Sequence, residues 1–286
     1  MKTFVQVAAR TELERMHAPE GELRRVCGVS ATYKSLDPRI PGEVPVFVGE
    51  WHNKLANEVA VVIKHQWKYG IKDGIKGYIF YGEPGTGKTW TAFKVAEILG
   101  LLELRKKYML ETVIFRDCAD LASWRYGETE KEIRNVFKKA YENAEEIKKR
   151  KHDAGVLIIF DDAEGLFLTR SYGSKLDTWY IAQLNVFFHE IDAMDTSKLF
   201  VILTTNRIDL LDEALKDRFV TKLFPLPEKE VLLKAAESKL MSLQVNDHNI
   251  IEEVKNFVLL NTRTFRDVNR IVTQKYIEWL IKKYEI

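Results

Sequence analysis

One eight-residue segment constrains this chain more than any other feature of its sequence. In order, its residues are Gly82, Glu83, Pro84, Gly85, Thr86, Gly87, Lys88 and Thr89. The segment matches the pattern G-x-x-x-x-G-K-[ST] at every fixed position, and it lies between a strand-like apolar run and a helix-like one. Glycines leave backbone N–H groups free to surround an anion, and the helix presents its positive end to that anion. The pattern therefore predicts a phosphate-binding loop, with Lys88 on nucleotide phosphates, Thr89 on Mg²⁺ and Trp90 beside them.

A second constraint is the apolar run Val156–Phe160, which ends in two carboxylates, Asp161 and Asp162. Open α/β sheets bind ligands at the carboxyl ends of their strands. We expect Asp161 to hold Mg²⁺ through water and Asp162 to orient or deprotonate an attacking water. The alternative is a pair of solvated aspartates at the end of a strand, which the preceding phosphate loop makes the weaker interpretation.

Short apolar segments and amphipathic segments alternate along the middle of the chain. Strands are expected over residues 77–81, 112–116, 156–160 and 199–204, and helices over 50–69, 89–99, 128–150 and 177–193. This alternation predicts an α/β fold, a parallel sheet covered by helices on both faces. Beyond residue 227 only helices are expected, over 228–242, 250–260 and 265–283. The sequence thus predicts a nucleotide-binding α/β domain over 40–225 and a small all-α domain over 226–286. We expect residues 1–39 to be a poorly defined N-terminal extension, too short for a separate folded domain.

From about Lys54 onward the chain resembles the AAA+ family of P-loop ATPases, and in motif style its protein-remodelling branch. Besides the two motifs above, four stretches carry the resemblance through their order and spacing: Ser123–Phe137, Gln183–Met194, Leu199–Asn206 and Leu211–Phe219. The resemblance implies an AAA+ sheet domain followed by a helical lid. It also implies ATP and Mg²⁺ as cofactors and a homo-oligomeric ring, six subunits by resemblance.

The resemblance also implies roles for single residues. Asn206, at the end of the sensor-1-like strand, would position the lytic water. Arg218 resembles an arginine finger, which would project into the neighbouring subunit's nucleotide, and its alternative is a plain surface arginine. Arg266 matches the sensor-2 position, at which a lid arginine contacts the phosphates. Arg263 is the competing candidate, and a solvated helix start without a phosphate role is the other alternative.

A loop in Ser123–Phe137 resembles the first pore loop of the remodelling branch. Trp124, Arg125 and Tyr126 would line a pore, where aromatic side chains grip a threaded polypeptide by apolar contact. The family usually has an aromatic residue at the position of Arg125. Here the aromatic side chains lie one residue away on either side, at Trp124 and Tyr126. Packing of these aromatics on their own domain is the alternative.

Two further departures concern catalysis. Asp162 stands where the family usually has Glu, and a side chain one methylene shorter reaches about 1.5 Å less far, which can cost about 100-fold in rate. Hydrolysis is then slow, or the backbone compensates, or Glu164 contributes. Lys216-Asp217 precedes Arg218 where the branch often has a second arginine, so a second finger is missing or lies elsewhere, with Arg207 as a candidate.

Composition limits the partners. The chain has 44 basic and 42 acidic side chains, a balance that gives no support for a strongly nucleic-acid-seeking surface. Its two cysteines, Cys27 and Cys118, are too few for a disulfide framework, which favours a reducing compartment. No signal-peptide-like or membrane-spanning apolar run is visible, so we expect a cytoplasmic protein without membrane contact.

The leading functional hypothesis is a Mg-ATP-dependent ring that remodels or threads a protein partner. One alternative is a nucleic-acid-associated AAA+ ATPase, such as a loader or a regulator of transposition or replication. Another is a slow ATP-gated switch or scaffold, which the short Asp162 favours. The adenine contacts cannot be assigned, because the corresponding region around Val44–Gly49 is too divergent.

Overall fold

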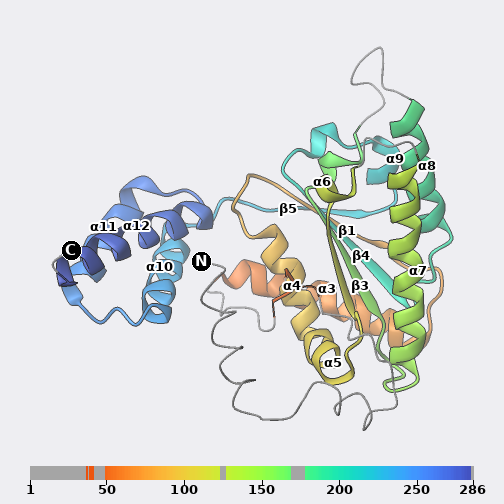
Figure 1. Ribbon diagram of the computed structural model, residues 1–286, viewed down its shortest axis with the longest axis horizontal. Coiled ribbons are helices and arrows are strands. Elements are labelled where there is room, and N and C mark those ends of the chain that lie inside the picture. Colours follow the sequence, from red (N-terminus) through yellow and green to blue (C-terminus); the bar gives the residue numbers. More distant parts are fainter. Residues whose placement is uncertain (1–36, 38, 42–48, 123–126, 169–177, 285–286) are drawn as a thin grey trace, which may run out of the picture. The chain divides into compact units, whose positions relative to one another are not determined.

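The structure is a computed structural model that describes residues 37, 39–41, 49–122, 127–168 and 178–284 (Figure 1). The chain divides into two compact units, Met1–Ser35 and Leu36–Ile286, and every described residue belongs to the second. Among the described helices, none combines the length and the apolar character needed to span a membrane.

Five parallel strands form the central sheet in the order β2-β3-β4-β1-β5. Their bounds are β1 Gly77–Tyr81, β2 Val113–Asp117, β3 Val156–Asp161, β4 Leu199–Thr205 and β5 Val220–Leu223. The predicted parallel sheet is confirmed, and four of its strands lie within one residue of the expected ranges. The fifth, β5, was not predicted, because its residues are mostly exposed and so carry no continuous apolar run.

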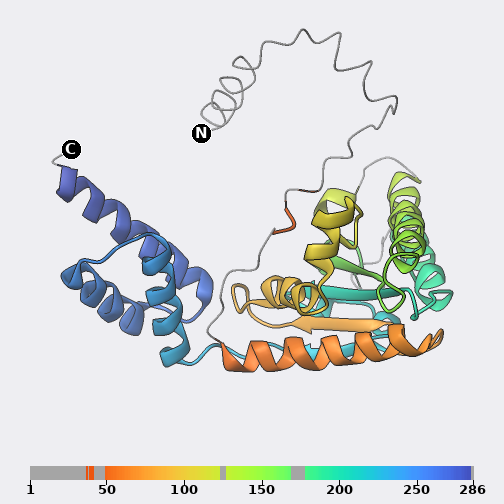
Figure 2. The same ribbon diagram turned by 90° about the horizontal axis from the view of Figure 1, so that it is seen from below.

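Helices cover both faces of this sheet (Figures 1 and 2). One face carries α3 (Glu50–Tyr69), α4 (Lys88–Ile98) and α5 (Leu101–Tyr108), and the other carries α7 (Glu128–Lys148) and α8 (Thr178–Asp192). Alternate residues of strand β3 pack into two hydrophobic cores, one on each face of the sheet. Ile158 and Phe160 pack with α7 and α8, whereas Leu157 and Ile159 pack with the helices on the other face. The unbroken apolar run of β3 follows from this two-sided burial.

Three helices follow the sheet: α10 (Lys229–Ser242), α11 (His248–Asn261) and α12 (Phe265–Tyr284). They pack into a hydrophobic cluster of their own, in which Leu232, Val254 and Val272 are fully buried. No strand occurs in the described stretch 224–284. This arrangement agrees with an all-α lid, while the boundary at residues 225 and 226 stays a prediction.

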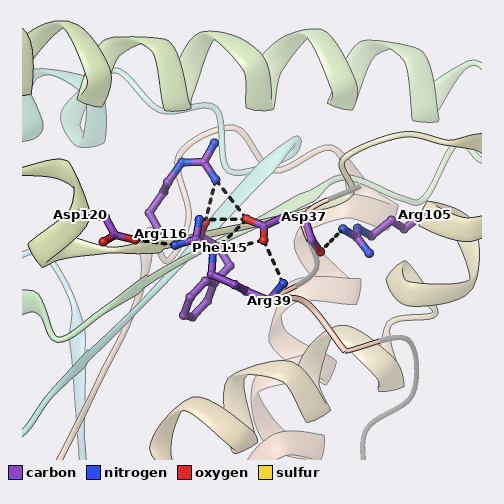
Figure 3. Close-up of polar contacts among 6 residues, drawn as sticks. All are labelled: Asp37, Arg39, Arg105, Phe115, Arg116 and Asp120. Carbon is purple, nitrogen blue, oxygen red and sulfur yellow. Dashed lines mark hydrogen bonds and ion pairs between the residues drawn. The ribbon is translucent and has the colours of Figure 1, made fainter. Parts of the chain in front are cut away.

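The short described segment around Asp37 is tied to the sheet domain by charged side chains (Figure 3). The Asp37 carboxylate accepts hydrogen bonds from Arg39, and its backbone carbonyl accepts one from Arg105 at 2.7 Å. Burial would raise the pKa of Asp37, but the Arg39 bonds and the Arg116 charge lower it overall. Ile40, 4% exposed, packs with the core of α3 to α5. The segment is therefore anchored at both its polar and its apolar side chains.

Candidate functional site

The predicted phosphate loop joins β1 to α4. Three of its glycines have positive φ angles, +145° at Gly82, +78° at Gly85 and +95° at Gly87. Side chains are disfavoured there, so the backbone curls in a way that the glycines alone permit. Lys88 is the first residue of α4, and its Nζ donates to the carbonyls of Gly82 and Glu83 at 2.9 and 2.8 Å. Its ammonium group thus lies inside the curl of the loop.

A pocket of about 370 Å³ opens beside this loop and gathers most of the predicted site residues. Its lining consists of Gly85, Gly87, Lys88, Thr89, Trp90, Asp161, Asp162, Thr204, Asn206, Phe265 and Arg266. Among the residues predicted from the loop, Gly82, Glu83, Pro84 and Thr86 do not line it. Four segments far apart in the sequence therefore meet at one cavity, at the carboxyl ends of β1, β3 and β4.

Asp161 is held by two hydroxyl groups. Thr89 Oγ1 donates to Asp161 Oδ1 at 2.6 Å, and the hydroxyl of Thr204 donates to the same oxygen. Hydroxyl and carboxylate oxygens are the ligands that Mg²⁺ prefers. Thr204 was not predicted as a site residue, because its sequence context indicates a strand and no function. Its contact with Asp161 arises because β4 pairs with β3 in the sheet.

Asp162 follows β3 in a left-handed conformation, with φ +50°. Its Oδ1 accepts a hydrogen bond from Asn206 Nδ2 at 3.0 Å, so the structure brings the proposed base and the sensor-like asparagine into contact. Partial burial and the charges of Asp161 and Glu164 raise the pKa of Asp162, which makes its carboxylate a stronger base than an isolated one.

The charge inside the loop is balanced by carboxylates. Lys88 is 6% exposed, and burial lowers the pKa of its ammonium group. The carboxylates of Asp162 and Glu164 act in the opposite direction and favour the charged form, whereas Arg266 adds to the lowering. A pocket that combines one buried cation with several acids suits a ligand that carries both phosphate charge and a metal ion.

Arg266 reaches the pocket because the start of α12 is fixed by a capping box. Asp267 N donates to Thr264 Oγ1 at 3.3 Å, and Thr264 N donates to Asp267 Oδ2 at 3.1 Å. Phe265 N donates to Gly85 O at 3.0 Å and ties this turn to the phosphate loop. Arg263 does not line the pocket, and its guanidinium lies 3.9 Å from Glu83. The geometry thus favours Arg266 over Arg263.

Arg218 does not line the pocket of its own chain. Its guanidinium is held by Asp192 in two hydrogen bonds of 2.8 and 2.9 Å, donates to Ala214 O, and stacks over the Phe188 ring at 4.5 Å. Its side chain is 30% exposed, and Asp192 raises its pKa further. Arg207, the alternative second finger, pairs with Asp209. The candidate pore-loop residues Trp124, Arg125 and Tyr126 lie outside the described residues.

His52 is a site neighbour that no motif marks. Its Nε2 lies 2.8 Å from Thr86 O, and its ring meets those of Phe224 and Phe265. Burial lowers the pKa of this imidazole. A second pocket of about 400 Å³ extends from His52 and Trp51 to the segment that leads into α10. No sequence pattern indicated this second pocket, because its lining residues come from two segments far apart in the sequence, 49–54 and 225–231.

The doubly covered parallel sheet, with the glycine loop and paired aspartates at its carboxyl edge, defines a P-loop nucleotide-binding protein. The sequence profile described as "ATPase family associated with various cellular activities (AAA)" matches residues 78–225, more than half of the chain. The chain belongs to this AAA family of ATPases.

Among similar proteins, the "Vesicular-fusion protein SEC18" of Saccharomyces cerevisiae is 32% identical over 204 residues, covering 66% of this chain and 25% of that protein. The "AAA ATPase forming ring-shaped complexes" of Micrococcus luteus is 35% identical over 145 residues, covering 49% of this chain and 22% of that protein. This chain therefore spans about a quarter or less of those two relatives. In the solved "Structure of E. coli MS115-1 HORMA:CdnC:Trip13 complex", a chain of 22% identity shares the fold with a TM-score of 0.57, over 84% of this chain and 83% of that one.

Proposed function

We propose that this protein binds Mg-ATP in the pocket beside the phosphate loop and hydrolyses it there. The observation that carries the proposal is the convergence of one buried ammonium group, one hydroxyl, two carboxylates and one amide on a single cavity. These groups belong to Lys88, Thr89, Asp161, Asp162 and Asn206. Membership of an ATPase family supports the choice of ATP.

The residues present fit both parts of that ligand. The positive φ angles of Gly85 and Gly87 leave a cradle without side chains for phosphate oxygens, and Lys88 supplies a positive charge within it. Thr89 Oγ1 and Asp161 Oδ1 are adjacent hard oxygen donors, 2.6 Å apart, which suit Mg²⁺. Bound Mg²⁺ would offset charge that develops on the phosphates. Asp162 then takes a proton from the attacking water, while Asn206 holds that carboxylate in place.

The second pocket is our candidate for the nucleotide base. It adjoins the phosphate loop through His52 and is lined by the Trp51 ring together with Pro225, Leu226 and Pro227. An aromatic and apolar wall suits the flat, weakly polar face of a purine. Gly49, from the region left unassigned in the sequence, also lines it.

We further propose that the active form is a homo-oligomeric ring, a hexamer in the leading hypothesis, in which Arg218 serves the pocket of the next subunit. Its absence from the pocket of its own chain supports this. To meet a phosphate, the guanidinium would exchange its two bonds to Asp192 for charge-assisted bonds of the same kind. The name of the Micrococcus luteus relative describes it as forming ring-shaped complexes. We also propose that this ring threads or remodels a protein partner in the cytoplasm. The balanced net charge of the chain favours a protein over a nucleic acid as that partner.

The test is ATPase activity per subunit as a function of protein concentration. A finger supplied by a neighbour contributes about 10³–10⁵ in rate, so activity should rise steeply as rings form. Arg218→Ala should remove that rise while Mg-ATP binding persists. Lys234→Ala, which removes a half-exposed cation of α10 that pairs with Glu230, is the control and should keep the rise. Activity that does not depend on concentration would contradict a shared site.

The slow ATP-gated switch is the second candidate, and the short side chain of Asp162 favours it. The structure gives Asp162 an unusual left-handed backbone and a hydrogen bond to Asn206, so its reach is set locally rather than by length alone. Turnover well below one per minute in the assembled ring would favour the switch. A nucleic-acid partner would instead show as DNA- or RNA-stimulated hydrolysis that is lost steeply with salt.

A further inference from the structure

Glu164 stands beside the pocket but does not line it. It is the middle residue of η1 (Ala163–Gly165), the short 3₁₀ turn that follows β3. Its Oε1 accepts a hydrogen bond from the backbone N–H of Asn206 at 3.1 Å. Its Oε2 is buried and, within the described part of the chain, has no hydrogen-bond partner. A buried carboxylate oxygen without a donor costs free energy, so its presence at this place calls for a reason other than stability.

The backbone that carries Glu164 is held by packing and by a hydrogen bond within its turn. Ala163 is fully buried, and Gly165 N donates to Asp162 O at 2.8 Å. A Cβ added at Gly165 would come within 3.3 Å of Ala119 N, which shows how closely the turn packs on α6 (Cys118–Leu121). This turn places the carboxylate of Glu164 against the backbone N–H of Asn206.

The residue that it holds is the first one after β4. Every residue of β4 is buried, whereas Asn206 leaves the sheet and depends on local bonds. Glu164 fixes its backbone N–H, and Arg207 N donates to Thr205 Oγ1 at 3.0 Å to fix the next peptide. The side-chain amide of Asn206 then donates to Asp162 Oδ1 at 3.0 Å. Hydrogen bonds therefore link Glu164 to Asp162 through Asn206.

We infer that Glu164 is a positioning residue for ATP hydrolysis, whose hydrogen bond to the Asn206 N–H keeps the Asn206 amide against Asp162. The inference rests on the proposed function, because it assigns Asp162 and Asn206 to the attack of water. It also explains how an aspartate can serve where a longer acid is usual. Aspartate has one rotatable bond fewer than glutamate with which to reach the water, so neighbours that set its position matter more to the rate.

Two variants of similar volume separate the hydrogen bond from the other properties of Glu164. Glu164→Gln keeps an acceptor oxygen for the Asn206 N–H, and Glu164→Met removes it while filling the same space. We expect the Met variant to lose about 10- to 100-fold in kcat, as a misplacement of about 1 Å does, and the Gln variant to stay within about threefold of wild type. KM and the Kd for Mg-ATP should differ less than about threefold between the two variants, since both remove the charge of Glu164 and its side chain does not line the pocket.

Asp73→Ala is the control, because it removes a carboxylate whose side chain is 94% exposed and does not line the pocket. A purely structural role would lower the Tm and would not split kcat from KM. The inference also predicts coupling: in an Asn206→Ala background, Glu164→Met should cost little more in kcat, because the two residues act as one unit. Should the Met variant not fold, Glu164→Ala takes its place beside the Gln variant.

Three results would overturn the inference: a wild-type kcat for Glu164→Met, a Gln variant as slow as the Met variant, or additive losses in the double variant. Each presupposes that the wild-type protein hydrolyses ATP. Failure of the proposed function is seen separately, as a wild-type protein that neither binds nor hydrolyses Mg-ATP.

Discussion

Gly85 offers the sharpest test of the contact between the phosphate loop and the first turn of α12. Its φ angle is +78°, and a Cβ added there would lie 2.7 Å from the Cβ of Arg266 and 3.0 Å from Thr264 Oγ1. Neither atom is the far end of a flexible side chain, so the turn that carries Arg266 must move. Gly85→Ala therefore adds a backbone cost and displaces an arginine that lines the pocket.

The two effects can be separated with Gly100, which has a similar φ angle of +72° and no atom within 4 Å of an added Cβ. An alanine held in the left-handed region costs about 1–2 kcal/mol, so Gly100→Ala should lower the free energy of unfolding by that amount. Gly85→Ala should lose the same amount plus about 1 kcal/mol for the bond from Phe265 N to Gly85 O. At about 2–4 °C per kcal/mol, the Tm should fall by roughly 2–8 °C for Gly100→Ala and by several degrees more for Gly85→Ala.

Nucleotide binding should distinguish the variants more clearly than stability does. We expect Gly85→Ala to weaken Mg-ATP binding by at least about tenfold, or about 1.4 kcal/mol, because the added methyl displaces Arg266 from the pocket that it lines. Gly100→Ala should bind as wild type does. Calorimetric titration with Mg-ATP, alongside thermal melts, measures both quantities. Wild-type affinity in Gly85→Ala, with a loss of Tm no larger than that of Gly100→Ala, would refute the reasoning.

Two other predictions concern single side chains. Asp162→Glu should lower kcat, because the left-handed backbone and the Asn206 bond are fitted to the shorter acid; a gain of tenfold or more, read by steady-state ATPase assay, would point to a slow switch instead. Burial, with smaller effects from Asp117 and Asp161, raises the pKa of the Cys118 thiol well above its ordinary value, so little thiolate forms near pH 8. In a Cys27→Ser background, iodoacetamide should label Cys118 at least about tenfold more slowly in buffer than in denaturant, and equal rates would show that the thiol is accessible.

Much of the fold was predictable because burial leaves a pattern in the sequence. The buried strands β3 and β4 are continuous apolar runs, and α3 was expected over the residues that it occupies, with Gly70 in the left-handed conformation at its end. The exposed strand β5 has no such pattern. Its place is set by pairing with β1, which brings Val220 opposite Tyr78.

The site residues also divide into those that a local sequence pattern marks and those that only the fold brings to the pocket. Lys88, Thr89 and Asp161 belong to short motifs whose chemistry can be recognised locally, and the structure places them together. Thr204 and Phe265 reach the pocket only through strand order and helix packing, which no spacing of residues expresses. The acceptor role of Glu164 toward Asn206 could be suspected from the sequence, but only the geometry gives it a partner.

The central claim is that phosphates bind in the curl of the glycine loop around the ammonium group of Lys88. Calorimetric titration of Mg-ATP into wild type, Lys88→Ala and Lys94→Ala tests it directly, since Lys94 lies on the same helix and pairs with Glu97 instead. We predict binding by wild type and Lys94→Ala, and a loss of at least about tenfold in Lys88→Ala, as expected for a charge-assisted hydrogen bond of about 1.5–3 kcal/mol. Equal affinity in all three proteins, or no uptake by the wild type at millimolar Mg-ATP, would contradict the claim.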